Sequence, residues 1–371
     1  QLPFMFEPLN SYTELLLPDD LLSTNSIISY INQNLGVEEC ENVEVIGWLY
    51  QFYISEKKDV LIKRKTRYST SEIPFVTQLF TPRWMVEYIT QNSLGRFWLE
   101  ARGNSNLRQE MQFFIEPTDG NPFLKREINS PEEITIIDIA CGSGHMLVYA
   151  FELLMKMYEE EGYYKSDIPE LIIGKNLYGL EIDERAASLA KFALIMKGME
   201  YDNKLLQKRI EPMIYCFRDS DEIPGFENAK TLGSLISPNT GELEFAIEKR
   251  EKLVESSNDD LLAISRLLGS KFDILLTNPP YVNGGYFNET TKNFVTKNFK
   301  DFGSDLFSVF IVRSFNLVKP DGYLGYVTPF VWMFISSYEK LRKQLIDYKT
   351  IVSLVRPSYH AFFESAYVPL C

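Results

Sequence analysis

The stretch that most constrains this chain runs from Phe272 to Tyr281 and reads Phe-Asp-Ile-Leu-Leu-Thr-Asn-Pro-Pro-Tyr. Its first half is almost continuously apolar, which is typical of a strand buried on both faces of a parallel sheet. Pro279 and Pro280 end that strand, because proline cannot donate to a β-ladder and holds the preceding residue extended. The stretch therefore predicts a rigid loop at the carboxyl edge of a central strand, where open α/β sheets bind ligands.

This loop carries groups that suit a flat molecule with an exocyclic amine. The Asn278 side-chain oxygen and the Pro279 carbonyl can each accept one N–H of that amine, and Tyr281 can stack on its ring. A simple turn after a strand accounts for the same residues. Short motifs also recur by chance, so the rest of the chain has to decide between the two interpretations.

A second ligand-binding pattern lies upstream. An apolar strand from Ile134 to Ile139 leads into Ala-Cys-Gly-Ser-Gly, ending at Gly144, and a long apolar helix follows. Glycines let the backbone approach a ligand, and the helix start presents free N–H groups. The next strand ends at Glu181, whose carboxylate can accept both hydroxyls of a ribose. These patterns predict an α/β, Rossmann-like sheet with helices on both faces.

Composition and charge exclude several other classes of function. Cys141 lies in the glycine loop and His145 directly follows it, but no third residue is evident to orient them as a nucleophile and base. Only two histidines are present, so we predict no metal site. A net charge of −13 excludes non-specific nucleic-acid binding by bulk electrostatics. Four scattered cysteines, with neither a signal peptide nor a membrane-length apolar run, predict a cytoplasmic protein.

The chain divides into an N-terminal helical region, residues 1–75, and a larger domain, residues 76–371. Apolar residues in the first region recur at helical spacing, at Trp48, Leu49, Phe52 and Tyr53. The basic cluster from Lys57 to Arg67 is interpreted as a solvated linker, with a phosphate contact as the alternative. Thr81 and Pro82 then predict the N-cap and first residue of a helix.

The C-terminal part contains further predicted elements. Ser304 and Asp305 cap a helix, Lys319 to Gly322 form a turn, and a strand follows at residues 323–327. Two more strands are predicted at residues 351–354 and 366–370. Because the chain starts at Gln1 without an initiator methionine and ends in an apparent strand, we expect it to be a fragment.

The order of these motifs resembles the γ-class N6-adenine DNA methyltransferases, from about residue 76 to the end. The motifs are the Thr-Pro helix, Asp-x-Ala-Cys-Gly-Ser-Gly, Gly-x-Glu-Ile-Asp, Asn-Pro-Pro-Tyr, Asp-Leu-Phe and a Pro-Asp-Gly before a strand. Three spans, at residues 50–58, 78–84 and 92–96, look like the BREX phage-defence methyltransferases of the PglX type. The resemblance implies S-adenosylmethionine as cofactor, DNA as substrate and other phage-defence proteins as partners. Family members carry a C-terminal target-recognition region, which we expect to be absent here.

The same resemblance implies a role for each matching residue. The residues implied to bind the cofactor are Thr81, Asp138, Ala140, Gly142, Gly144, Glu181, Ile182, Asn278 and Asp305. The catalytic motif comprises Asn278, Pro279, Pro280 and Tyr281. Tyr281 and Phe307 would form the target-base pocket. One departure from the family is the acid that many relatives carry after the third strand, which is not evident here. Gly233 to Leu235 is the candidate substitute.

The chemistry of the loop agrees with amine methylation. An aromatic amine is a poor nucleophile, and two acceptors that hold its hydrogens favour a pyramidal nitrogen whose lone pair points at the methyl donor. Alignment of this kind can supply roughly 7–11 kcal/mol. A target base must leave the duplex to reach such a loop. Cytosine C5 methylation is disfavoured, because it needs a thiolate nucleophile and the loop contains no cysteine.

Two other functions stay open at this point. A protein glutamine N5-methyltransferase also combines a helical N-terminal domain with Asn-Pro-Pro-Tyr, and the same acceptors can hold a side-chain amide. A catalytically silent cofactor-binding scaffold is the second alternative. Titration with S-adenosylmethionine is the simplest first test, because the proposed enzyme depends on binding this cofactor.

Overall fold

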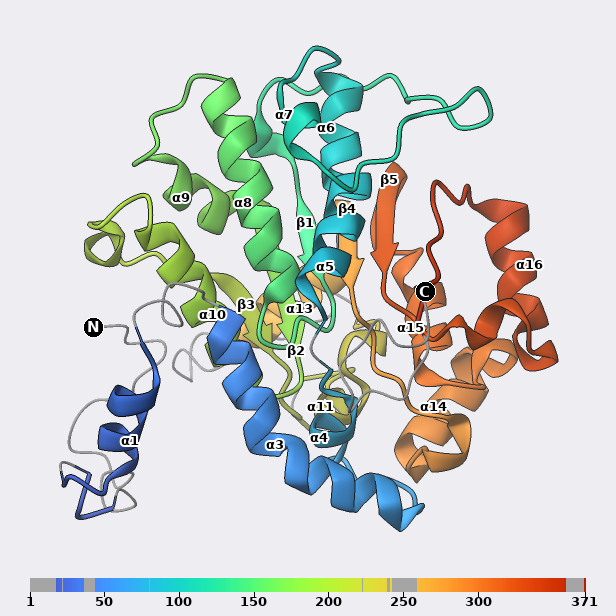
Figure 1. Ribbon diagram of the computed structural model, residues 1–371. Coiled ribbons are helices and arrows are strands. Elements are labelled where there is room, and N and C mark those ends of the chain that lie inside the picture. The colour runs from blue at the N-terminus through green and yellow to red at the C-terminus, as the bar shows by residue number, and fades with distance from the viewer. Residues whose placement is uncertain are drawn as a thin grey trace.

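The computed structural model describes residues 18–21, 23–36, 44–79, 81–221, 223–238, 241, 259–357 and 370–371. Its centre is a parallel five-stranded sheet in the order β3-β2-β1-β4-β5 (Figure 1). The strands are β1 (Ile136–Asp138), β2 (Leu177–Glu181), β3 (Met213–Cys216), β4 (Phe272–Thr277) and β5 (Val318–Tyr326). Chain order reverses between β1 and β4, and ligand crevices lie at such switch points. The predicted α/β sheet is confirmed.

Strand β4 has the central, doubly buried position that its apolar sequence predicts. It pairs with β1 on one side, where Ile274 lies opposite Ile136, and with β5 on the other. Successive side chains point to opposite faces of a strand. Accordingly, Ile274 and Leu276 belong to the core on one face of the sheet, and Leu275 belongs to the core on the other.

Helices cover both faces of the sheet (Figure 1). One core includes residues of α5 (Arg83–Thr90), α6 (Arg96–Ala101), α7 (Leu107–Glu110), α8 (His145–Glu160), α9 (Ile168–Leu171) and α10 (Glu184–Met199). The opposite core includes residues of α4 (Ile73–Thr77), α11 (Ala229–Leu232), α13 (Asp259–Gly269), α14 (Glu289–Asn298) and α15 (Leu306–Ser314). Helix α16 (Glu339–Tyr348) packs through Leu341 on a smaller cluster beside α15. None of the described helices is long and apolar enough to cross a membrane.

The N-terminal region contributes α1 (Ile27–Asn34) and α3 (Glu44–Arg64). Helix α3 packs against α4 and α10, and it buries Tyr50, Ile54 and Leu61. The apolar positions predicted from spacing point outward instead, with exposed fractions from 38% at Trp48 to 75% at Phe52. Helix α3 is apolar on more than one side, so periodicity alone did not identify its buried face. The division of the chain at residue 75 stays a prediction.

Two C-terminal predictions are wrong. Strand β5 continues through Lys319–Gly322, where we predicted a turn, and Asp321 takes a positive φ of 62°. The pairing with β4 shifts register between Phe272 and Ile274, so the turn-like residues form an irregularity within the strand. Residues 351–354 form no strand. Residues 366–369 of the last predicted strand lie outside the described residues, and Leu370 forms an isolated antiparallel bridge with Pro329.

Candidate active site

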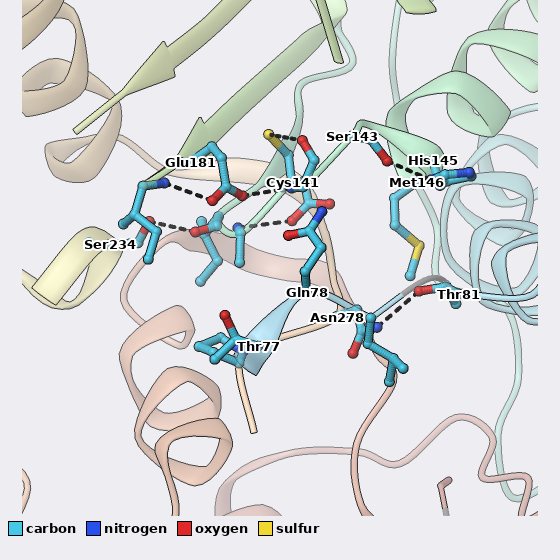
Figure 2. Close-up of a pocket in the computed structure, with 18 of the residues that line it drawn as sticks. Thr77, Gln78, Thr81, Cys141, Ser143, His145, Met146, Glu181, Ser234 and Asn278 are labelled. Atoms are coloured by element: carbon cyan, nitrogen blue, oxygen red, sulfur yellow. Dashed lines mark hydrogen bonds between the residues drawn. The ribbon is translucent and has the colours of Figure 1, made fainter. Parts of the chain in front are cut away.

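A cavity of about 90 Å³ lies where the loops after β1, β2 and β4 meet (Figure 2). The predicted site residues that line it are Thr81, Asp138, Ala140, Gly142, Glu181, Ile182, Asn278 and Pro280. They come from parts of the chain that are far apart in sequence. The switch point of the sheet brings them together, because the carboxyl ends of parallel strands share one edge.

Glu181 holds the glycine loop in place. Its Oε2 accepts a hydrogen bond from the Gly142 N–H at 2.7 Å, and its Oε1 accepts from the N–H groups of Ile182 and Asp183 at 2.9 and 3.1 Å. Gly142 has a φ of 53°, a backbone conformation that residues with a side chain rarely adopt. The carboxylate at the end of β2 therefore shapes the backbone around the space where a ligand would bind.

Gly144 has a packing role in this loop and does not line the cavity. It is the N-cap of α8 with a φ of 89°, and a Cβ there would lie 2.9 Å from the Ala190 Cβ. The missing side chain lets the start of α8 approach α10 closely.

Two buried acids give the cavity its electrostatic character. Burial raises the pKa of Asp138 to about 7, although the Ala140 N–H donates to its Oδ1 at 3.0 Å. Burial also raises the pKa of Glu181, and its three backbone N–H donors oppose that rise. Desolvation disfavours the charged form of both groups. A ligand that brings hydroxyl or ammonium donors would offset this cost.

The environment of Cys141 and His145 does not favour a nucleophile and base pair. Burial raises the pKa of the Cys141 thiol well above its usual value, so the reactive thiolate is disfavoured. Burial lowers the pKa of His145 to about 4, and its Nδ1 lies 3.2 Å from the Ser143 Oγ. The geometry thus supports the cofactor-loop interpretation.

The side chain of Asn278 is held at both ends. Its Nδ2 donates to the Thr81 Oγ1 at 3.0 Å, and its Oδ1 accepts from the Tyr281 hydroxyl, which also lies 2.9 Å from the Val327 carbonyl. The predicted N-cap role of Thr81 is wrong, because α5 begins at Arg83, Pro82 is its N-cap and no side chain caps it. The Thr81 hydroxyl serves the active-site loop instead.

Asp305 holds the segment that follows the Asn278 loop and does not line the cavity itself. Its Oδ1 accepts from the N–H groups of Val282 and Phe307, at 3.0 and 3.3 Å. These bonds tie the segment after Tyr281 to the start of α15. Burial raises the pKa of Asp305 to about 7.

The two aromatic residues predicted for a target-base pocket are neighbours. Phe307 meets Tyr281 edge-on, with ring centroids 6.3 Å apart, and stacks on Tyr338. Phe307 is fully buried, and neither it nor Tyr281 lines the cavity, nor does Pro279. Their contact with a target base stays a prediction.

Several cavity residues were not predicted. Gly47 and Gln51 come from α3, Gln78 precedes the Thr-Pro motif, and Phe217 follows β3 where an acid was expected. Gln51 and Gln78 lie in spans that carry the family resemblance, whereas Gly47 lies outside those spans. The candidate substitute, Ser234, lines the cavity, but its hydroxyl donates to the Ile139 carbonyl at 2.6 Å.

Two families of known proteins match parts of the chain. The family described as N-6 DNA Methylase matches residues 106–215. The family described as Eco57I restriction-modification methylase matches residues 175–363, which is just over half of the chain. The chain belongs to the Eco57I restriction-modification methylase family. Strands β2 to β5, with Glu181 and the Asn278 loop, lie within the second match.

Three curated relatives of this methylase family member are long proteins. The chain is 36% identical to the adenine-specific methyltransferase BrxX of Escherichia coli O9:H4 (strain HS), over 97% of this chain and 35% of that protein. It is 32% identical to the adenine-specific methyltransferase PglX of Lacticaseibacillus casei (strain Zhang), over 98% and 34%. It is 23% identical to the type II restriction enzyme and methyltransferase RM.Eco57I of Escherichia coli, over 95% and 34%. The chain spans about a third of each relative.

Proposed function

We propose that the protein is a site-specific DNA adenine N6-methyltransferase of a BREX-type phage-defence system, acting in the cytoplasm with S-adenosylmethionine. The observation that carries this proposal is the position of Asn278. It ends the central strand β4, lines the same cavity as Glu181 and Gly142, and is held at both ends of its amide. Relatives named for adenine-specific methylation support DNA adenine as the substrate.

The donor set of the cavity fits S-adenosylmethionine. Asp138 and the glycine loop would hold the methionine end, Glu181 would accept the ribose hydroxyls, and Ile182 would cover the adenine. At the proposed adenine end, a Cβ on Gly233 would lie 3.0 Å from the Ile182 Cγ2, so a side chain there would crowd Ile182. The cavity volume of about 90 Å³ is smaller than that of typical ligand pockets, which is about 300–1,000 Å³. Side chains must therefore shift when the cofactor enters.

The protein's part in the reaction is orientation. The bound cofactor supplies a sulfonium methyl group as the electrophile. Asn278 Oδ1 and the Pro279 carbonyl accept the two hydrogens of the target amine, which directs the nitrogen lone pair toward that methyl. The Asn278 Oδ1 has two lone pairs, so it can accept an amine hydrogen beside the Tyr281 hydroxyl, which also lies 2.9 Å from the Val327 carbonyl. Thr81 keeps the amide from rotating, because it binds Nδ2.

The test is methylation by the full-length protein together with the other proteins of its defence system. Methyl groups from labelled S-adenosylmethionine should enter duplex DNA, and digestion to nucleosides should yield N6-methyladenine. Asn278→Ala is the matched negative control. Labelling of protein glutamine in place of DNA would support the glutamine methyltransferase alternative. Cofactor binding without any transfer, under the same conditions, would support the silent scaffold.

A further inference from the structure

Helix α3 lies against the cavity. Gly47 and Gln51 line it, and a Cβ on Gly47 would lie only 2.4 Å from the His145 Cε1 and 2.8 Å from the Ser143 Oγ. Helix α3 can approach the start of α8 this closely because residue 47 has no side chain. This segment of the N-terminal region is therefore part of the wall around the cavity.

Two polar contacts attach α3 to the site. The Tyr50 hydroxyl donates to the Asp183 Oδ2, and Asp183 is the N-cap of α10, two residues after Glu181. The Lys58 Nζ donates to the main-chain carbonyl of Gln78 at 2.6 Å. Burial lowers the pKa of Lys58, so this member of the basic cluster does not fit the predicted solvated linker. The half-buried Lys58 ammonium thus holds the main chain at Gln78 through a hydrogen bond.

Gln78 is held by its backbone while its side chain faces the cavity. Its Nε2 lies 3.1 Å from the position of a Cβ on Gly142, and Figure 2 shows its side chain between Glu181 and Asn278. The hydrogen bond from Lys58 fixes the main chain and leaves the side-chain torsions free to adapt to a ligand.

The charges around the cavity indicate which part of a ligand meets Gln78. Asp138 and Glu181 are buried carboxyl groups that accept hydrogen bonds from backbone N–H groups, so they favour the ammonium and hydroxyl donors of a ligand over its anionic group. The Gln78 amide, by contrast, can donate two hydrogens, and the Lys58 ammonium binds the main-chain carbonyl of the same residue. The beginning of α8, at His145, adds the positive end of a helix dipole.

We propose that Gln78, positioned by Lys58 of α3, forms the subsite for the carboxylate of the amino-acid part of the cofactor. The inference rests on the proposed use of S-adenosylmethionine and deepens it. Gln78 contacts the ligand directly. Lys58 is a positioning residue that acts through Gln78, and it makes α3 a component of the cofactor site.

The first test compares two adjacent lysines by calorimetry of S-adenosylmethionine binding to the full-length protein. Lys58→Met should raise the Kd about tenfold, because the Gln78 main chain loses the charge-assisted hydrogen bond that positions it. Lys57→Met is the matched control. Lys57 is exposed and lies over the Phe75 ring, 3.7 Å from its centroid, without a bond to Gln78, so its Kd should change little. Equal effects of the two substitutions would overturn the role of Lys58.

The second test varies Gln78 and the ligand together. Gln78→Ala should weaken binding of S-adenosylmethionine about tenfold and leave binding of its decarboxylated analogue unchanged. Gln78→Glu should bind S-adenosylmethionine more weakly than Gln78→Ala, because two carboxylates would then face each other. Because Gln78 is half-buried, these variants should fold even if Lys58→Met does not, and thermal melting checks this.

Each contrary result has a distinct meaning. Tighter or unchanged binding by Gln78→Ala would show that the side chain only obstructs the cavity. Tighter binding by Gln78→Glu than by Gln78→Ala would mean that residue 78 faces the ammonium group. An equal loss with the decarboxylated analogue would also overturn the subsite. If the wild-type protein fails to bind S-adenosylmethionine at all, the proposed cofactor fails, and this inference fails with it.

Discussion

The target-amine loop and the cofactor cavity are built in different ways. Around Asn278 the contacts are made by side chains, because Thr81 binds one end of the amide and Tyr281 the other. Around Glu181 a carboxylate holds backbone N–H groups, and so sets the course of the main chain. The difference teaches that side-chain changes in the loop should affect the chemical step. Changes at the end of β2 should affect cofactor affinity.

Asn278→Ala should give the largest effect. The substitution removes an acceptor that is aligned with the reacting amine, and loss of one such preorganised group typically costs about 10²–10³ in rate. The Kd for S-adenosylmethionine should change little, because Asp138, Glu181, Gln78 and the glycine loop are the groups proposed to hold the cofactor. Single-turnover methyl transfer by the full-length protein measures the first quantity, and calorimetry measures the second. A near-normal rate would contradict the catalytic role of Asn278 and would favour the interpretation of Asn-Pro-Pro-Tyr as a simple turn.

Glu181→Ala should show the opposite pattern. Binding of S-adenosylmethionine should weaken by roughly 1–3 kcal/mol, since hydrogen bonds to a charged group are lost and the Gly142 N–H loses its acceptor. The single-turnover rate at saturating cofactor should fall much less than in Asn278→Ala. If the rate falls while the affinity stays normal, the proposed division between the two regions is wrong.

Asp305→Asn sharpens the comparison through the pH dependence of stability. Burial raises the folded-state pKa of Asp305 from 3.8 to about 7, so the wild type loses stability as pH rises between these two values. Asparagine keeps an acceptor for the Val282 and Phe307 N–H groups but does not ionise. The free energy of unfolding of the variant should therefore rise relative to wild type between pH 5 and pH 8, by an amount on the order of 2 kcal/mol.

Chemical denaturation at the two pH values measures this gain. The difference between variant and wild type isolates Asp305 from Asp138, whose pKa is also raised to about 7. If the difference in free energy of unfolding between variant and wild type is the same at pH 5 and pH 8, burial does not raise the pKa of Asp305.

Tyr281→Phe should give the smallest effect. Stacking alone would make this change neutral, but the hydroxyl also bonds the Asn278 Oδ1 and lies 2.9 Å from the Val327 carbonyl. Loss of one neutral hydrogen bond is worth about 0.5–1.5 kcal/mol, so the rate should fall by roughly two- to tenfold, with cofactor affinity unchanged. Tyr281→Ala is the comparison variant, since it also removes the ring. Identical rates for the wild type and Tyr281→Phe would show that the Tyr281 hydroxyl does not contribute to the reaction and that only its ring does.

Much of the scaffold of the site follows from local sequence. Two prolines end a strand wherever they occur, and an apolar run without polar alternation belongs in the middle of a parallel sheet. That is why the position of Asn278 at the end of β4 was predictable. Positive φ at Gly142, and the carboxylate of Glu181 at the end of β2, follow in the same way from residue type and strand order.

Only the tertiary structure decided which partner each polar group takes. Thr81 has the sequence of a helix cap, yet its hydroxyl binds the Asn278 amide 197 residues away, because the fold places the loop after β4 beside it. Helix α3 offers apolar residues on more than one side, so its buried face depends on where α10 lies. Lys58 has the sequence context of a solvated charge until the Gln78 carbonyl is placed beside it. Local sequence determines the backbone conformation of a segment, whereas hydrogen-bond partners and burial depend on which distant segments the fold brings next to it.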